Sequence, residues 1–338
     1  MIKTELKPSG MTLYTLVNDN GMEVELIELG ATIVSIKIPK GDKKIDVVLG
    51  YDDLNKYKEN PCFFGSCIGP VANRTAGASF SIDGVKYSLP VNEGKNNLHS
   101  DFEKGFHKRM FNPVIDFVKN QVCFTLHLDD MEYGLPGNRD FTVSYSLTDD
   151  NTLEIEYKMI SDKKTAISPT NHTYFNLGGH DSGSILSEEV KIYASFFTSV
   201  GSDLIPKEIS PVAGTPFDFM DFKKVGKEIN ADHQQLEYGG GYDHNFILAQ
   251  NKDAVAVVKD NTTGISMEVY TDLPGIQFYT GNNIGTLVGK NNEIYKKNFG
   301  LCLETQYIPN SLNDDRFDSP VIKAGEEFVS KTGYHFIF

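Results

Sequence analysis

The chain has 338 residues, of which 40% are hydrophobic and 23% charged, as in ordinary globular proteins and unlike disordered or collagen-like ones. Lys and Arg number 32 against 46 Asp and Glu, a formal net charge of −14 that repels polyanions, so neither nucleic acid nor an anionic membrane is expected as a main partner. Four cysteines without CxxC spacing indicate neither a disulfide framework nor a zinc site. No apolar run is long enough to cross a bilayer, and the N-terminus lacks the features of a signal peptide, so we expect a cytoplasmic protein.

Hydrophobic residues alternate with a period of two through most of the chain, which is typical of β-strands. The expected strands and hairpins are, in chain order, 34–38, a hairpin over 80–89 around Asp83-Gly84, the pair 141–147 and 153–159, the pair 255–257 and 265–269, and the terminal segment 336–338. In the second pair, we expect Val255 and Val257 to lie opposite Ile265, Met267 and Val269. Helix-like patterns are confined to 53–58 and 223–236. We therefore predict a single domain over residues 1–338 with a large antiparallel all-β fold and few short helices.

Common motifs of nucleotide-binding and hydrolytic enzymes are missing from the sequence. It contains no GxxxxGK[ST], no GxGxxG that opens a helix, no HExxH and no GxSxG. Several histidines lack the spacing of metal ligands, namely His107, His127, His180, His233 and His335. We therefore expect no metal and no cofactor.

Residues 168–177 contain a histidine in a setting that suits proton transfer. If the segment is extended, His172 and Tyr174 share one face. A histidine titrates near neutrality and can act as a general acid or base. The alternative is a core histidine whose ring is hydrogen-bonded to neighbouring backbone, and the pattern by itself favours this alternative.

A carboxylate lies between apolar strand residues in 300–306. Here Cys302, Glu304 and Gln306 are expected to point to the same side. Burial would raise the pKa of Glu304, as a working base requires. A solvated rim carboxylate or one half of a structural ion pair would fit the pattern equally well.

Three further polar clusters lie among apolar or glycine residues: Asn73-Arg74, the segment 96–99 that ends in His99, and Asp243-His244. Taken singly, each is consistent with an ordinary loop.

Taken together, these stretches resemble the aldose 1-epimerase family, the galactose mutarotases. The resemblance runs almost end to end. It is carried by Asn73-Arg74, Leu98-His99, residues 133–137, the Thr-Asn-His-x-Tyr-Phe-Asn-Leu block at 170–177, residues 243–246, residues 274–282, and Glu304-Thr305-Gln306. It implies a β-supersandwich fold and an isomerase that interconverts the α and β anomers of free aldohexoses such as D-galactose and D-glucose.

The resemblance also implies roles for individual residues. Glu304 would be the general base on the anomeric hydroxyl, and His172, as a protonated imidazole, the general acid on the ring oxygen. The sugar would be held by Arg74, His99 and Asp243, with Asn73, Tyr174 and Gln277 as further contacts. The ring would open, rotate about C1–C2 and close on the other face, with the two catalytic roles exchanged on closure.

Three departures from the family pattern concern sugar preference. Ser100-Asp101 stands where two glycines are usual, Pro70 where an arginine is common, and Leu312 within the loop after the Glu-Thr-Gln block. No departure removes a catalytic residue.

Three other functions stay open: a hexose-6-phosphate 1-epimerase, a non-catalytic sugar-binding module, and a glycoside hydrolase with Asp243 and Glu304 as its two carboxylates. A phosphate would need several cations, and the chain has four arginines. The expected partner is a small sugar, and the protein is expected to be a monomer or a homodimer.

Overall fold

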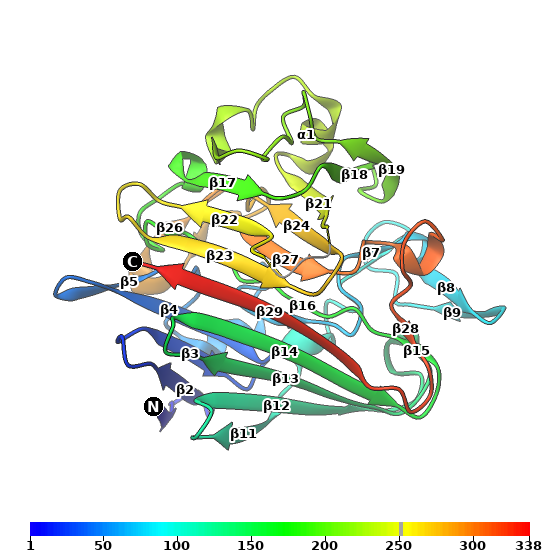
Figure 1. Cartoon of the computed structure of the whole chain (residues 1–338). Helices are drawn as coiled ribbons and strands as arrows, with labels where there is room; N and C mark the ends of the chain where they lie inside the picture. The colour runs from blue at the N-terminus through cyan, green and yellow to red at the C-terminus, as the bar shows by residue number, and fades with distance from the viewer. Residues whose placement is uncertain (250–252) are drawn as a thin grey trace.

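A computed structural model describes residues 1–249 and 253–338, and antiparallel β-sheet dominates it (Figure 1). The largest sheet has nine strands in the spatial order β11-β12-β13-β14-β29-β23-β22-β17-β20. These are β11 (Asn112–Asp116), β12 (Gln121–Leu128), β13 (Arg139–Leu147), β14 (Thr152–Ser161), β29 (Phe328–Ile337), β23 (Ser266–Thr271), β22 (Ala256–Lys259), β17 (Glu189–Ile192) and β20 (Lys223–Lys224). The C-terminal strand β29 lies in the middle, so the sheet joins the two halves of the chain.

Two five-stranded sheets accompany the large one. The first consists of β1 (Ile2–Leu6), β2 (Thr12–Val17), β3 (Glu23–Ile27), β4 (Thr32–Lys40) and β5 (Lys43–Asp46) in that order. The second has the order β19 (Pro206–Pro211), β18 (Phe196–Val200), β21 (Asp243–Ile247), β24 (Gly275–Tyr279) and β27 (Cys302–Gln306). Side chains join β27 to β29, because the Tyr334 hydroxyl donates to the Leu303 carbonyl at 3.1 Å and the hydroxyls of Thr305 and Thr332 are hydrogen-bonded.

Short elements complete the described chain. The remaining strands are β6 (Cys67–Ile68), β7 (Arg74–Thr75), β8 (Ser79–Ile82), β9 (Val85–Ser88), β10 (Asn97–Leu98), β15 (Thr165–Ala166), β16 (Thr170–Asn171), β25 (Leu287–Val288), β26 (Ile294–Tyr295) and β28 (Val321–Ile322). The 3₁₀ helices are η1 (Leu54–Lys58), η2 (Ala76–Ala78), η3 (Phe106–Lys108), η4 (Glu132–Gly134), η5 (Ile185–Ser187), η6 (Val225–Lys227), η7 (Lys290–Asn292) and η8 (Ser311–Asn313), and α1 (Gln234–Gly239) is the one α-helix among the described residues. None of the helices in these residues is long and apolar enough to cross a membrane.

The predicted all-β antiparallel architecture with few short helices is confirmed. The hairpin over 80–89 pairs Phe80 with Tyr87, and its turn residues Asp83 and Gly84 both have positive φ. In the pair β13–β14, Val143 lies opposite Tyr157, as the alternation predicts. Strict alternation succeeds here because one face of each strand is buried in the core, where each fully buried large apolar side chain contributes roughly 1.5–3 kcal/mol.

Two sequence expectations need correction. In the pair β22–β23, Ala256 and Val258 lie opposite Val269 and Met267, and Val257 lies opposite Glu268. The predicted pairing of residues was wrong because 254–258 is apolar throughout, so the sequence does not show which side chains of this strand point to the core. The predicted helix over 223–236 is also wrong: the segment begins as β20, and α1 starts at Gln234 and ends at Gly239, with Gly240 as a left-handed C-cap.

Candidate active site

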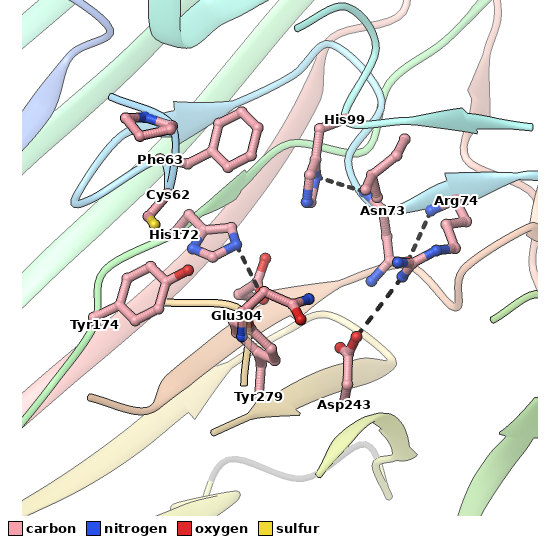
Figure 2. A pocket seen from close by; sticks show the side chains of 13 residues that line it. Cys62, Phe63, Asn73, Arg74, His99, His172, Tyr174, Asp243, Tyr279 and Glu304 are labelled. Carbon is pink, nitrogen blue, oxygen red and sulfur yellow. Dashed lines mark hydrogen bonds and ion pairs between the residues drawn. The ribbon is translucent and has the colours of Figure 1, made fainter. Parts of the chain in front are cut away.

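A cavity of about 200 Å³ opens beside β21, β24 and β27, and most of its lining is polar or aromatic (Figure 2). It is lined by Pro61, Cys62, Phe63, Asn73, Arg74, Leu98, His99, His172, Tyr174, Asp243, Tyr279, Asn283 and Glu304. The volume is below the roughly 300 Å³ at which pockets for drug-sized ligands begin, so the cavity suits one small polar molecule.

Three adjacent strands form one wall of the cavity. Asp243 of β21 lies opposite Tyr279 of β24, which in turn lies opposite Cys302 of β27. Glu304 follows Cys302 by two residues, and side chains two apart on a strand point to the same face. The strand register therefore places Asp243, Tyr279 and Glu304 on one surface.

The segment that carries His172 is fixed by its backbone. The His172 N–H donates to the Ser66 carbonyl at 2.9 Å, and the His172 carbonyl accepts from the Gly65 N–H at 3.1 Å. The Thr170 hydroxyl donates to the Thr305 carbonyl at 2.8 Å, which ties the segment to β27 beside Glu304. Although β16 ends at Asn171, His172 and Tyr174 both face the cavity, with ring centroids 5.0 Å apart.

Two loops that are distant in sequence are joined at Asn73 and His99. The His99 N–H donates to the Asn73 carbonyl at 3.1 Å, and the Asn73 N–H donates to His99 Nδ1 at 3.1 Å. Because Nδ1 accepts a hydrogen bond, neutral His99 carries its ring proton on Nε2. Burial, reinforced by His172 and Arg74, holds the pKa of His99 well below its usual value, so the ring stays neutral and offers an Nε2–H donor.

Ser100 stabilises the same loop. Its φ is 66°, a left-handed conformation that a glycine adopts without strain. The Ser100 hydroxyl offsets the strain by donating to the Val71 carbonyl at 2.8 Å and accepting from the Val71 N–H at 2.9 Å. The other two departures, Pro70 and Leu312, lie outside the lining of the cavity.

Arg74 is held by a carboxylate that no sequence motif contains. Its Nε and Nη2 donate to the two carboxylate oxygens of Glu93 at 2.7 and 2.8 Å. This leaves Nη1 toward Asp243, whose Oδ2 is 4.0 Å away. Burial lowers the pKa of Arg74, but Asp243 and Glu93 more than offset it and raise the pKa above its usual value. Burial also raises the pKa of Asp243, although Arg74 and a hydrogen bond from Gln277 oppose the shift.

His172 and Glu304 form the one carboxylate–imidazole pair among the described residues of the lining (Figure 2). His172 Nε2 and Glu304 Oε1 are 3.9 Å apart, too far for a hydrogen bond. Glu304 is 3% exposed, and its Oε2 has no hydrogen-bond partner among the residues that the structure describes. The buried carboxylate therefore has capacity to accept a proton or a hydrogen bond from a ligand.

Burial shifts the two pKa values in opposite directions. It raises the pKa of Glu304 well above 4.5, an effect that Asp243 strengthens and Arg74 weakens. It lowers the pKa of His172 to about 4. The protonated imidazole expected from the sequence is therefore not the ground state, because a charge on either group is poorly solvated here. Of the arrangements in which the pair holds one proton, burial favours the neutral one, in which the proton is on Glu304.

Three residues of the cavity bring possible metal-ligand atoms close together. His99, His172 and Glu304 have ligand-type atoms within 4.8 Å of one another. A metal on His99 Nε2 would require a proton on Nδ1, where the Asn73 N–H already donates. The donor set therefore fits a metal ion poorly.

Seven of the eight site residues predicted from the sequence line this cavity, namely Glu304, His172, Arg74, His99, Asp243, Asn73 and Tyr174. The eighth, Gln277, lies behind Asp243 and donates to its Oδ1 at 2.7 Å, without a place in the lining.

Sequence reasoning missed several lining residues and one supporting residue. Tyr279 lies within the recognised block 274–282 but was not singled out, whereas Cys62 and Asn283 carried no signal. Phe63 packs against both His99 and His172, with ring centroids 5.3 and 5.7 Å away, and its φ of 58° is not revealed by the sequence. Glu93 is visible only through its contact with Arg74.

Comparisons with known proteins agree with this geometry. The family described as aldose 1-epimerase matches residues 12–335. A galactose mutarotase from Sus scrofa is 39% identical over 337 residues, which cover 97% of this chain and 96% of the relative. An aldose 1-epimerase from Escherichia coli (strain K12) is 37% identical over 341 residues, which cover 98% of this chain and 97% of the relative. The crystal structure of the GalM/aldose epimerase homologue from C. elegans superposes with a TM-score of 0.89 at 26% identity, covering 97% of this chain and 99% of the other. The protein is therefore an isomerase that belongs to the aldose 1-epimerase family.

Proposed function

We propose that the protein interconverts the α and β anomers of free aldohexoses such as D-galactose and D-glucose, as one domain over residues 1–338. The observation that carries this proposal is the buried pair in which His172 Nε2 lies 3.9 Å from Glu304 Oε1, with Glu304 Oε2 free of protein partners among the described residues. Opening a pyranose requires removal of the proton on the C1 hydroxyl and delivery of a proton to the ring oxygen. A carboxylate and an imidazole that line one cavity can perform both proton transfers.

In the proposed mechanism, Glu304 takes the proton of the C1 hydroxyl and His172 gives a proton to the ring oxygen. Before the sugar binds, burial favours the neutral forms of Glu304 and His172. The hydroxyls of the sugar and Arg74 then stabilise the charged pair, in which the proton has passed from Glu304 to His172. The C1–O5 bond of the hemiacetal breaks to give the aldehyde at C1 and a hydroxyl on C5. The aldehyde then rotates about C1–C2, and closure on the other face exchanges the two roles. His99 donates Nε2–H to the oxygen on which charge develops, and a neutral donor there avoids a second buried charge.

The remaining lining residues anchor the hydroxyl groups of the sugar. Asp243 accepts hydrogen bonds and Arg74 donates through Nη1, which its bidentate pair with Glu93 leaves free. Asn73 supplies a further polar contact, and the rings of Phe63, Tyr174 and Tyr279 cover the C–H surfaces. We propose Gln277 as a support of Asp243 in addition to the contact predicted from the sequence.

Polarimetry tests this function directly. Freshly dissolved α-D-galactose, α-D-glucose, xylose and maltose are followed by optical rotation with and without the protein. If the proposal is right, the optical rotation of galactose and glucose changes faster with the protein than without it and reaches the same final value as in the spontaneous reaction. Tight binding of galactose without acceleration would instead indicate a sugar-binding module, and release of reducing sugar from maltose would indicate a hydrolase.

A phosphorylated substrate is disfavoured by the cations of the cavity. Among its described lining residues, Arg74 is the sole lysine or arginine, and two of its nitrogens are bonded to Glu93. Arg109 and Arg316 pair with Glu132 and Asp314, and Arg139 donates to backbone carbonyls. Galactose 6-phosphate in the same assay separates the alternatives, because faster decay with it than with galactose would overturn the preference for a free sugar.

Replacement of Arg74 with alanine is expected to raise KM for galactose by roughly 10- to 100-fold, the effect of losing one charge-assisted hydrogen bond. Initial polarimetric rates over a range of galactose concentrations give KM and kcat. The control is Arg316→Ala, which removes an exposed arginine paired with Asp314. An unchanged KM in Arg74→Ala would show that Arg74 does not contact the sugar.

The pH dependence of kcat/KM is expected to reflect a pair that holds one proton in total. Activity should fall as the pH drops through about 4, where His172 gains a proton while Glu304 keeps its own. It should fall again as the pH rises through the raised pKa of Glu304, where the pair loses its proton. The spontaneous rate is subtracted at each pH, and circular dichroism confirms that the protein is folded. An acidic midpoint near 6.5 would contradict the assignment, because it would indicate a histidine with an ordinary pKa.

A further inference from the structure

Beside Asp243, on the same face of β21, β24 and β27, lies a group of buried carboxamide side chains. The register of β21, β24 and β27 aligns Asn245, Gln277 and Glu304 in one row across the three strands. Gln306 follows Glu304 by two residues and therefore points to the same face. It is 1% exposed and lies outside the lining of the cavity.

Gln306 is the centre of this group. Its Nε2 donates to Asn245 Oδ1 at 3.1 Å and to Gln277 Oε1 at 3.2 Å. Its Oε1 accepts from Asn73 Nδ2 at 3.3 Å. One buried carboxamide therefore joins Asn73, Asn245 and Gln277, which come from three distant parts of the chain.

A series of hydrogen bonds runs from Asn73 through Gln306 and Gln277 to Asp243. At both ends of this series, neighbouring groups determine which way the carboxamide oxygen and NH₂ group point. At one end, Asn73 Oδ1 accepts from the Arg74 backbone N–H at 2.8 Å, so Asn73 must present its NH₂ group to Gln306. At the other end, Gln277 Nε2 donates to Asp243 Oδ1 at 2.7 Å, so Gln277 must present its oxygen to Gln306. Gln306 alone satisfies both neighbours, because it has an acceptor on one side and a donor on the other.

The backbone leaves room for this arrangement. Gly275 of β24 lies opposite Gln306 of β27. A Cβ atom at Gly275 would lie 2.5 Å from Asn245 Oδ1, closer than non-bonded atoms approach. The absence of a side chain at 275 therefore permits the Asn245 carboxamide to reach Gln306.

We propose that Gln306 is a positioning residue for the sugar: its carboxamide sets the orientation of Asn73 and, through Gln277, of Asp243 on the wall of the cavity. Gln306 acts on the sugar through these residues and does not touch it. The inference rests on the proposed function, because it concerns the binding step of the same reaction.

The decisive variant is Gln306→Glu, which keeps the shape of the side chain but replaces its donor with an acceptor. The new oxygen would face Gln277 Oε1 and Asn245 Oδ1, so Gln277 must turn and present its own oxygen to the Asp243 carboxylate. We expect KM for galactose to rise about 10-fold or more while kcat changes less than about 3-fold, because Glu304 and His172 stay in place. Isothermal titration with D-galactose should show the same loss of affinity.

A second variant and a control keep the test independent of folding. Gly275→Ala crowds Asn245 without a change of charge and is expected to raise KM in the same direction. Gln121→Glu makes the matched substitution on the large sheet, where Gln121 Nε2 contacts Ser146, and should leave KM unchanged. The positioning role of Gln306 is wrong if the wild-type protein accelerates mutarotation and the folded variants Gln306→Glu and Gly275→Ala have the same KM as the wild type. A fall in kcat with unchanged KM in these variants would also overturn the positioning role. If the wild-type protein binds galactose without acceleration, the proposed function fails, but the affinities of the variants for galactose still decide the role of Gln306.

Discussion

Replacing Glu304 with glutamine is expected to lower kcat for galactose mutarotation by about 10²- to 10⁴-fold, the usual contribution of one positioned proton transfer. Glutamine has nearly the same shape, but it cannot take the proton of the C1 hydroxyl. Initial rates by polarimetry at saturating galactose give kcat. Near-wild-type turnover would exclude Glu304 as the base.

The same variant is expected to fold as well as the wild type. Burial raises the pKa of Glu304 well above 4.5, so ionisation of this side chain is harder in the folded than in the unfolded protein. Glu304 therefore lowers stability at pH values above about 4.5, where the unfolded chain is ionised, and this cost disappears when the pH falls below that value. Glutamine removes the cost at neutral pH, so the Tm of Glu304→Gln should equal or exceed that of the wild type.

Glu188 offers a matched control for Glu304. It is also buried, and burial raises its pKa to about 8, but it contacts the Leu177 N–H through Oε1 and is not part of the cavity lining. Glu188→Gln keeps this acceptor and should retain wild-type kcat. A large loss of turnover in this control would mean that removal of any buried carboxylate disturbs the site.

Replacing His172 with asparagine or glutamine is expected to lower kcat by a similar 10²- to 10⁴-fold. Asparagine places an amide near the position of Nδ1, which lies 3.5 Å from Cys302 Sγ, and glutamine places one near Nε2. Both amides form hydrogen bonds, but neither exchanges a proton with the ring oxygen. Polarimetry at saturating galactose measures the loss, and circular dichroism checks the fold.

His180→Asn is the matched control for His172. His180 is buried, and its Nδ1 contacts the hydroxyl of Tyr295, outside the cavity. This variant should lose about 1 kcal/mol of stability but keep kcat. If either variant at His172 retained turnover while binding galactose normally, His172 would not be the acid.

Much of the fold was predictable from local patterns. The partners in β13–β14 follow from alternation, because a shift of one residue would turn every apolar side chain of one strand to solvent. The turn at Asp83-Gly84 was predictable because few residues tolerate the positive φ that it needs. Where alternation is absent, as in 254–258, the register depends on neighbouring strands and the prediction was wrong.

For the site, the sequence by itself determined which residue types are present and, through the resemblance of whole blocks, which of them belong together. Only the tertiary structure decided how they act. The bidentate contact of Glu93 with Arg74, the orientation of the carboxamides around Gln306, and the neutral state of His172 follow from groups that the chain brings together from distant positions. Hydrogen-bond direction and desolvation depend on these neighbours in space, and no local pattern of residues records them.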